Sequence, residues 1–211
     1  MKRKGTGLMV SGLILVLAAA GLTGYNLLQS HQAQQSSYQV VQVLEQKLPL
    51  TEPSAEEKTD EIIPETQPDY VRFPNMEMPV VSVDGQDYIG TVQIPSQELE
   101  LPVAAQWSYE ALRSTPCRYH GSAYSYDLIL MALIYDSHFG KLRNLRIDDW
   151  VTFVDTDGNT FVYRVVEREE LPGTAVEDMA AGQWALTLFT CTYGGKSRIT
   201  IRCQRIREAA Y

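Results

Sequence analysis

Two residues near the carboxyl end of the chain, Cys191 and Arg198, have the types and the spacing for joint chemistry. A cysteine reacts as its thiolate, and a guanidinium held nearby favours that form and stabilises a negatively charged oxygen. Arg202 follows on the same strand face and is the second candidate for the arginine. The pair predicts nucleophilic attack on a carbonyl group.

The segments around these two residues predict a β-hairpin. Residues 184–191 (WALTLFTC) and 198–205 (RITIRCQR) each alternate between two faces, as strands do. The residues between them include two neighbouring glycines, which suit a turn. Closure of this hairpin would set Cys191 opposite Arg198.

From residue 76 onward, the sequence consists of short strands separated by turn residues. The further strands that we predict lie at residues 88–94, 99–104, 127–133, 150–155 and 160–167. Short helical pieces are predicted at residues 109–114, 138–145 and 175–181. The pattern predicts an all-β fold, in which an antiparallel sheet of about eight strands closes or nearly closes into a barrel. The strand at 127–133 is apolar at almost every position and is therefore predicted to be buried on both faces.

The N-terminal region has the pattern of a membrane anchor. Basic residues occupy positions 2–4, no further charged residue appears until Glu45, and residues 8–28 are predominantly apolar. Such a stretch is long enough to cross a bilayer as a helix, and the preceding basic residues favour a cytoplasmic N-terminus. We therefore predict a single-pass anchor at residues 1–29 in the cell membrane and an extracellular domain.

A cleaved signal peptide is the alternative interpretation of the same region. Residues 8–17 would be its apolar core, and the alanines at 18–20 would be its cleavage region. The apolar pattern continues past those alanines to residue 28, which favours the uncleaved anchor. Both interpretations export the rest of the chain.

Residues 30–75 have the composition of a tether between this anchor and a domain at 76–211. Residues 38–48 carry a short helical stripe of apolar residues, which either packs on the domain or simply leaves the membrane. Residues 49–75 contain five prolines and seven acidic residues, as expected of an extended, solvated spacer.

The composition excludes several classes of function. A length of 211 residues suits one domain with appendages, and the formal net charge of −8 argues against nucleic acid as a partner. The three cysteines lack close metal-type spacing, so the sequence indicates neither a disulfide framework nor a metal site, and no cofactor is expected. Cys117 and Cys203 are predicted to be packing residues. Whether these two pair in a disulfide is left open.

Four segments of the chain, in order, resemble the sortases, a family of cell-surface cysteine transpeptidases. They are DYIGTVQIPSQELELPV, TPCRYHGSAYSYDLILMALIYDSHFGKLRNL, IDDWVTFVDTDGNTFVYRVVEREEL and the hairpin with TLFTC followed by an arginine. The resemblance runs from about residue 81 to residue 205 and implies the sortase β-barrel. The motif HFGKL is similar to class B members, whereas the connection at 170–183 is short for that class.

The resemblance also implies a reaction and its partners. Cys191 would cleave a C-terminal sorting signal of a surface protein and hold that protein as a thioester, with Arg198 assisting. An amine of peptidoglycan or of a pilin subunit would then take the protein. Membrane attachment would run through residues 8–28.

The chain departs from the family pattern at one position. Sortases have a histidine at the end of the long buried strand, and Leu133 stands there in the stretch MALIYDSHFG. Loss of a positioned acid or base typically costs a factor of about 10²–10⁴ in rate. His120, beside the same strand, is the first candidate for a substitute, and His138 is the second. A catalytically weak or inactive module that binds sorting signals or envelope partners is therefore the alternative function.

Overall fold

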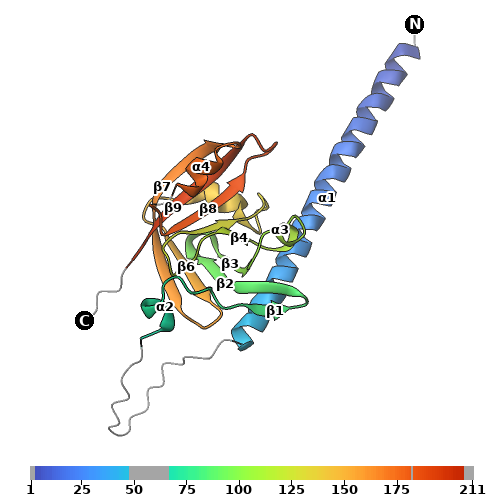
Figure 1. Cartoon of the computed structure of the whole chain (residues 1–211). Coiled ribbons are helices and arrows are strands. Elements are labelled where there is room, and N and C mark those ends of the chain that lie inside the picture. Colours follow the sequence, from blue (N-terminus) through green and yellow to red (C-terminus); the bar gives the residue numbers. More distant parts are fainter. Residues whose placement is uncertain (1–2, 48–66, 182, 207–211) are drawn as a thin grey trace.

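The computed structural model describes residues 3–47, 67–181 and 183–206, and for residues 3–11, 26–27, 29–36 and 45–47 it describes the backbone alone. The strands in this part of the chain (Figure 1) are β1 (Val81–Val83), β2 (Gln86–Ile94), β3 (Leu99–Ala104), β4 (Cys117–His120), β5 (Leu128–Met131), β6 (Trp150–Asp155), β7 (Thr160–Pro172), β8 (Leu186–Cys191) and β9 (Ser197–Arg205). The α-helices are α1 (Arg3–Lys47), α2 (Asp69–Arg72), α3 (Ala111–Ser114) and α4 (Val176–Ala180), and two 3₁₀ turns are η1 (Pro95–Gln97) and η2 (Phe139–Asn144).

The strands form one sheet that closes on itself. Its order is β1-β2-β3-β4-β5-β8-β9-β7-β6, and a further pairing of β2 with β6 completes a barrel of eight strands with β1 outside the ring. This confirms the predicted all-β barrel with short helices. Two neighbouring pairs, β3 with β4 and β5 with β8, are parallel, so the prediction of an antiparallel sheet was wrong for them. Each pair is joined by a long connection that returns the chain to the end of the sheet from which it started.

Closure of the barrel depends on a glycine in β2. Gly90 has a φ of +148° and pairs with Asp155 of β6, and a Cβ at this position would collide with the carbonyl oxygen of Val154. The register between β2 and β3 shifts at the same point. A side chain here would separate the two strands that close the ring.

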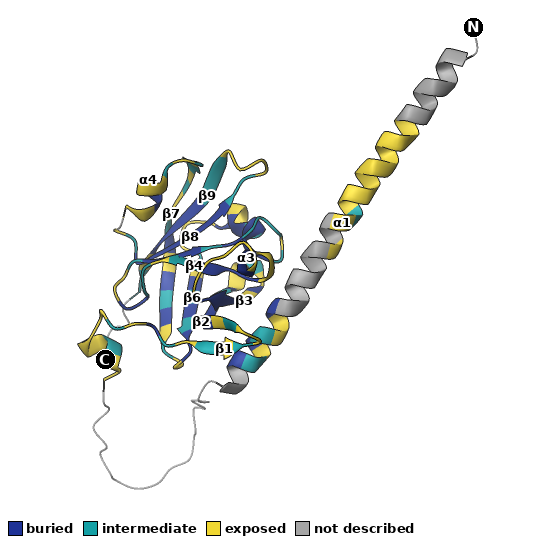
Figure 2. Cartoon of the chain, turned by 45° about the vertical axis from the view of Figure 1, so that its right-hand side comes forward, coloured by how far each residue is buried: buried dark blue, intermediate teal, exposed yellow. Residues whose placement is uncertain are grey.

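Strand β5 lies in the middle of the sheet, between β4 and β8, as predicted. Leu128, Ile129 and Leu130 are buried, in agreement with the expected burial on both faces. Figure 2 shows that buried residues also run along the labelled strands of the barrel, such as β6 and β8. The strand is shorter than the predicted range 127–133, because the chain turns beyond Met131. Phe139 donates a backbone hydrogen bond to the carbonyl oxygen of Leu133, which starts the turn into η2.

The predicted helical pieces form where the sequence placed them, as α3, η2 and α4. Two strands were not predicted. Strand β4 has four residues, CRYH, and the edge strand β1 has three, VSV. Sequence periodicity cannot detect strands this short.

The end of α1 packs against the barrel. Val41 and Leu44 are buried, and the hydroxyl of Ser37 donates a hydrogen bond of 2.7 Å to the carbonyl oxygen of Ser114 in α3. The helix also contacts β1 and β3. Of the two predicted roles for the apolar stripe at 38–48, packing on the domain is the one that the structure shows.

Within the part of the chain that the structure describes, no helix is both long enough and apolar enough to cross a membrane. The predicted anchor is therefore not supported. Residues 8–28 are helical, as part of α1.

Both described ends of the expected tether are helical. Residues 30–47 belong to α1, and Tyr70 of α2 stacks on Tyr124 of the barrel, with ring centroids 4.8 Å apart. Tyr70 also packs against the hydrophobic core. Residues 48–66 of the expected tether lie outside the described residues.

Candidate active site

Cys191 and Arg198 are direct partners across the hairpin of β8 and β9. Cys191 is the last residue of β8, and Arg198 is the second residue of β9. In an antiparallel pair, directly opposed residues project from the same face, with Cβ atoms roughly 4.5–5.5 Å apart. The hairpin predicted from the sequence therefore brings these two side chains together.

The turn that joins the two strands is fixed by its own hydrogen bonds. Thr192 donates its N–H to the carbonyl oxygen of Ser197 at 2.8 Å, and Gly195 donates to the carbonyl oxygen of Thr192 at 2.9 Å. Gly194 and Gly195 both have positive φ angles, of 83° and 69°, which glycine adopts without strain. The positions of Cys191 and Arg198 thus follow from a turn that this sequence can form locally.

A backbone carbonyl holds the guanidinium of Arg198. Its Nη1 donates a hydrogen bond to the carbonyl oxygen of Gly173, and the N–H of Gly173 donates to the carbonyl oxygen of Lys196 at 2.9 Å. The guanidinium also lies 6.0 Å from the ring centroid of Phe189. Its remaining N–H groups have no hydrogen-bond partner among the described residues, so they are able to bind a substrate oxygen.

The three cysteines differ in access to solvent. Cys191 is partly exposed, whereas Cys117 and Cys203 are buried, and all three are free thiols. Burial raises the pKa of Cys117 to about 12 and also raises the pKa of Cys203. Both buried thiols are therefore protonated near neutral pH. They pack in the interior, as the sequence predicts, and they do not pair.

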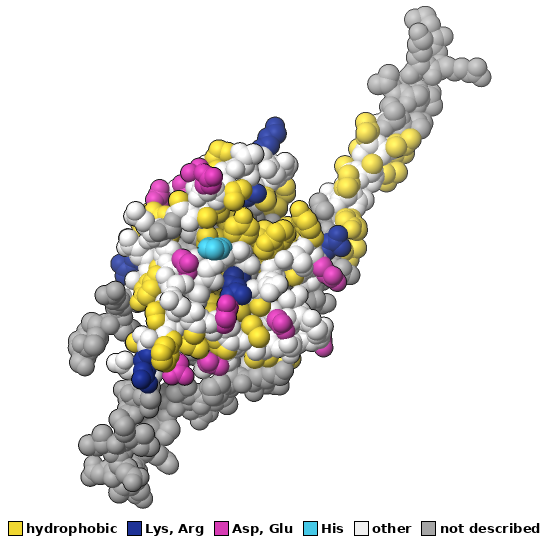
Figure 3. Space-filling model, in the orientation of Figure 1, with side chains coloured by type: hydrophobic (Ala, Val, Ile, Leu, Met, Phe, Trp, Pro, Cys, Tyr) yellow, Lys and Arg dark blue, Asp and Glu magenta, His cyan; other side chains and the backbone are white. Residues whose placement is uncertain are grey.

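The outer face of the sheet beside Cys191 is apolar. Phe189, two residues before Cys191 on the same face of β8, packs with Ile129 of β5 and Met179 of α4. The ring of Tyr119 meets Phe189 edge-on at a centroid distance of 5.4 Å. Figure 3, in the orientation of Figure 1, shows hydrophobic side chains gathered on the face below α4.

Arg202 serves the fold of this region. It is buried and forms an ion pair of 2.7 Å with Glu169. Its guanidinium also donates hydrogen bonds to the carbonyl oxygens of Asp178 and Met179, at 2.7 and 2.9 Å, and to the hydroxyl of Thr187 at 3.1 Å. Arg202 thereby holds α4 on the sheet, and its N–H groups are already engaged.

Leu133 follows the end of β5, the parallel neighbour of β8. Met131 is in register with Phe189, and Ala132 donates its N–H to the carbonyl oxygen of Phe189 at 3.2 Å. Extending this register by two residues on each strand brings Leu133 level with Cys191. Leu133 packs against an apolar cluster that contains Ala104, Ala111, Leu112 and Cys117. The leucine side chain cannot donate or accept a proton.

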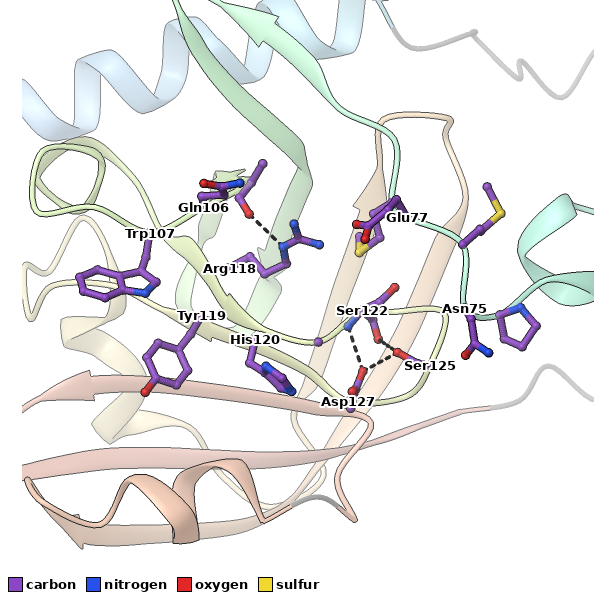
Figure 4. Close-up of a pocket in the computed structure, with 15 residues that line it drawn as sticks. Asn75, Glu77, Gln106, Trp107, Arg118, Tyr119, His120, Ser122, Ser125 and Asp127 are labelled. Atoms are coloured by element: carbon purple, nitrogen blue, oxygen red, sulfur yellow. Dashed lines mark hydrogen bonds between the residues drawn. The ribbon is translucent and has the colours of Figure 1, made fainter.

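His120 is remote from the thiol. It pairs with Ile129, which pairs in turn with Thr187, four residues before Cys191 on β8. Two strand spacings of about 4.8 Å and four residues of about 3.3 Å separate the Cα atoms of His120 and Cys191 by about 16 Å. The side chain is exposed and lines a separate cavity (Figure 4). His120 is the last residue of β4.

His138 is closed off from substrate. The side chain is fully buried beside Tyr135, with ring centroids 5.7 Å apart, and burial lowers its pKa to about 4. The ring is therefore neutral near pH 7. The structure brings neither of the two histidines proposed as substitutes to Cys191 in a form that could exchange a proton with substrate.

Two contributors to the site were not anticipated from the sequence. Gly173 supplies the carbonyl that holds Arg198, and a Cβ on Gly173 would lie 2.8 Å from the carbonyl oxygen of Gly195. Phe189 forms the floor between α4 and β5. A glycine after Pro172 is a turn signal, but no local pattern reveals which distant arginine its carbonyl will meet.

Comparisons with known proteins agree on one family. A family model described as a sortase domain matches residues 92–206. The structure is similar to sortase C1 from Streptococcus suis, with a TM-score of 0.51 and 24% identity over 67% of this chain and 80% of that chain. It is also similar to a lid mutant of sortase A from Corynebacterium diphtheriae, with a TM-score of 0.54 and 14% identity over 67% of this chain and 92% of that chain.

A third similar structure is sortase C from Clostridium perfringens with the C-terminal cell wall sorting motif. It has a TM-score of 0.50 and 20% identity over 58% of this chain and 72% of that chain. A search of curated proteins gave no match. At these identities the solved structures establish the fold, and the family model establishes which residues of this chain carry it.

Proposed function

Because the chain belongs to the sortase family, whose members are cysteine transpeptidases, we propose that it is a sortase-type transpeptidase that uses Cys191 and Arg198. In this proposal Cys191 is the nucleophile, and Arg198 binds the oxygen that becomes negatively charged. The expected place of action is the cell envelope, where sortases attach surface proteins.

The observation that carries this proposal is the direct pairing of Cys191 with Arg198 next to the turn of the hairpin. Arg198 keeps one N–H on the carbonyl of Gly173, so its orientation is set before substrate arrives. Preorganised donors of this kind are worth more than mobile ones, because they need no reorganisation when charge develops.

The first half-reaction would form a thioester. The Cys191 thiolate attacks a peptide carbonyl carbon, a C–S bond forms, and the carbonyl oxygen becomes an oxyanion that the free N–H groups of Arg198 stabilise. Collapse of this intermediate breaks the C–N bond. In this proposal Leu133 takes the place of the family's histidine and cannot supply a proton, so the leaving amine takes its proton from water.

The second half-reaction would transfer the bound protein. An amine attacks the thioester carbon, a new C–N bond forms, the amine nitrogen loses a proton to water, the C–S bond breaks and the thiolate is restored. Peptidoglycan or a pilin subunit would provide this amine, and a surface protein with a sorting signal would provide the acyl group. The sorting motif present in the Clostridium perfringens sortase C structure supports this substrate class for a barrel of the same fold.

A weak or inactive module that binds sorting signals is the second candidate function. It is favoured by the arrangement around Leu133, since His120 lies on a remote part of the sheet and His138 is buried and neutral. The two candidate functions overlap if Arg198 alone supports slow acylation of Cys191. We expect acylation to be measurable, and turnover to be slower than in a sortase with the histidine.

Mass spectrometry of the intact protein tests the proposal. The full chain would be incubated with a pool of synthetic peptides that carry C-terminal sorting signals, and Cys191→Ala would be the control. We expect a mass increase equal to the N-terminal part of a peptide, located on Cys191 and released by hydroxylamine, which cleaves thioesters. Saturable peptide binding without any adduct would replace the transpeptidase proposal by the binding module.

A further inference from the structure

A cavity of about 680 Å³ lies on the barrel where two strands diverge. Strands β3 and β4 pair at a single position, Ala104 with Cys117, and the chain then separates into residues 105–107 on one side and 118–122 on the other. The N-terminal segment at residues 74–78 borders the opening. The cavity therefore forms because β3 and β4 separate after their single paired position.

The cavity combines a cation, aromatic surface and carboxylates. Figure 4 shows Arg118 between Glu77 on one side and the rings of Trp107 and Tyr119 on the other. Asp127 lies at the foot of the cavity, where its carboxylate accepts hydrogen bonds from within its own loop, from the N–H of residue 122 at 2.9 Å and a serine hydroxyl at 2.5 Å. That carboxylate is thus already engaged.

The positive charge of Arg118 is not neutralised by an ion pair with any described residue. Its Nε donates a hydrogen bond of 2.9 Å to the carbonyl oxygen of Ala105, which fixes the plane of the guanidinium. Among the described residues, no carboxylate lies within ion-pair distance of Arg118, and its Nη atoms have no hydrogen-bond partner. A fixed guanidinium with two free edge groups matches the two oxygens of a carboxylate.

One aromatic contact links the cavity to the apolar face beside Cys191. Tyr119, on its wall, contacts Phe189, which lies two residues before Cys191 on the same face of β8. Arg118 is level with Leu130 and Leu188, so its Cα lies about 14 Å from that of Cys191 by strand spacing and rise. An extended peptide covers that distance in four or five residues.

We propose that this cavity binds an acidic side chain of the substrate polypeptide, four or five residues to the amino-terminal side of the scissile bond. The carboxylate would sit on Arg118, and the aliphatic part of the side chain would lie against Trp107 and Tyr119. The amino-terminal side is the part that remains attached to Cys191 as a thioester, so this contact would persist through both half-reactions. The inference rests on the proposed function.

The first test uses short probes and does not depend on catalysis. N-acetyl-glutamate N-methylamide and its glutamine counterpart would be titrated into the full chain, with the indole N–H of Trp107 followed by NMR. We expect the glutamate probe to bind about tenfold more tightly, the scale of one charge-assisted pair. Arg118→Gln should remove this difference, and Arg113→Gln, a matched control on exposed α3 surface, should keep it.

A substitution of Glu77 distinguishes anion binding by Arg118 from a purely structural role of Arg118. Its exposed carboxylate faces the cavity and competes with an incoming acid for Arg118, so Glu77→Gln should tighten binding of the glutamate probe several-fold. Equal affinities of the two probes, or an unchanged affinity in Arg118→Gln, would overturn the inference. Tighter binding of an N-acetyl-lysine probe would overturn it as well.

A second test separates this inference from the proposed function. The probe titration would be repeated in Cys191→Ala, where binding should persist because the cavity does not contain the thiol. For a peptide that acylates Cys191, moving one glutamate along the sequence should lower KM most at the fourth or fifth residue before the scissile bond, with kcat unchanged. Absence of acylation with intact probe binding would remove the proposed function alone. A glutamate effect confined to the other side of the scissile bond would overturn the inference.

Discussion

The neighbouring strands β5 and β8 run parallel and end side by side, but their ends differ in chemistry. Strand β8 ends at Cys191, opposite an arginine whose orientation is fixed by a carbonyl. Beyond the end of β5 comes Leu133, which packs into an apolar cluster between β4 and α3. The first end holds groups that can react, and the second holds a side chain that only fills space.

The difference shows that packing and catalysis make separate demands on the same strand ends. The register of β5 with β8 depends on backbone hydrogen bonds and on the buried residues Leu128 and Leu130. None of these contacts requires a titratable group at position 133. A leucine at this position is compatible with the fold, so the barrel forms whether or not the residue there can transfer a proton.

The largest expected effect comes from the reactive end. Cys191→Ala should abolish thioester formation, because the alanine side chain has no nucleophilic atom. Brief iodoacetamide treatment of the unaltered protein should label Cys191 in preference to Cys117 and Cys203, which are buried with raised pKa values. Tryptic mapping would locate the label. Predominant modification of Cys203 would contradict the strand faces on which the site is built.

A comparison of the two arginines on β9 gives the next effect. Arg198→Gln should slow acylation by about 10²–10³, the scale for loss of one oxyanion donor, with little change in thermal stability. Arg202→Gln should instead lower the free energy of unfolding by about 3–5 kcal/mol, because it leaves a buried ion-pair site unfilled. Acylation rates and melting curves of both variants would be measured. Equal effects of the two substitutions on acylation would remove the distinction drawn between them.

Placing a histidine after the end of β5 is expected to raise the turnover rate. Leu133→His, combined with Ile134→Asn to supply a polar neighbour for the new ring, should raise turnover of sorting-signal peptides by about 10²-fold, as expected of a positioned acid or base. The measurement is steady-state release of the peptide's C-terminal fragment. Turnover at a full sortase rate in the unaltered protein, with loss of that rate in His120→Ala, would show that a different histidine serves the reaction.

The smallest effect concerns His138, in the segment that follows β5. Its pKa of about 4 in the folded protein lies below the ordinary value near 6.5, so the unfolded chain binds more protons between these limits. Stability should therefore fall as pH decreases from about 6.5 to 4, by about 3 kcal/mol at most. His138→Phe should flatten this part of the pH profile in urea melts. An unchanged slope in the variant would assign the pH dependence to other groups.

Local patterns predicted the hairpin and most of the strands, because alternation and glycine turns are properties of neighbouring residues. Residues 184–191 and 198–205 needed nothing beyond themselves to place Cys191 opposite Arg198. The parallel pairing of β5 with β8 could not be predicted in this way, since a buried apolar strand does not specify its partner.

The sequence favoured Arg198 over Arg202 by its place opposite Cys191, but it could not show that Arg202 is engaged elsewhere. Both lie on the same face of β9, and their chemical type is identical. The distinction arises because α4, from the connection between β7 and β8, ends over Arg202 and presents two backbone carbonyls to it. A tertiary contact of this kind has no signal in the local pattern.

The packing of α1 on the barrel has a consequence for limited proteolysis. Ser37, Val41 and Leu44 are buried against the body of the protein, although they precede residues 48–66 in the chain. A single cleavage between residues 48 and 66 would give two polypeptides on a denaturing gel. Because the buried contacts would outlast the cut, the two pieces should elute together from a sizing column until denaturant is added.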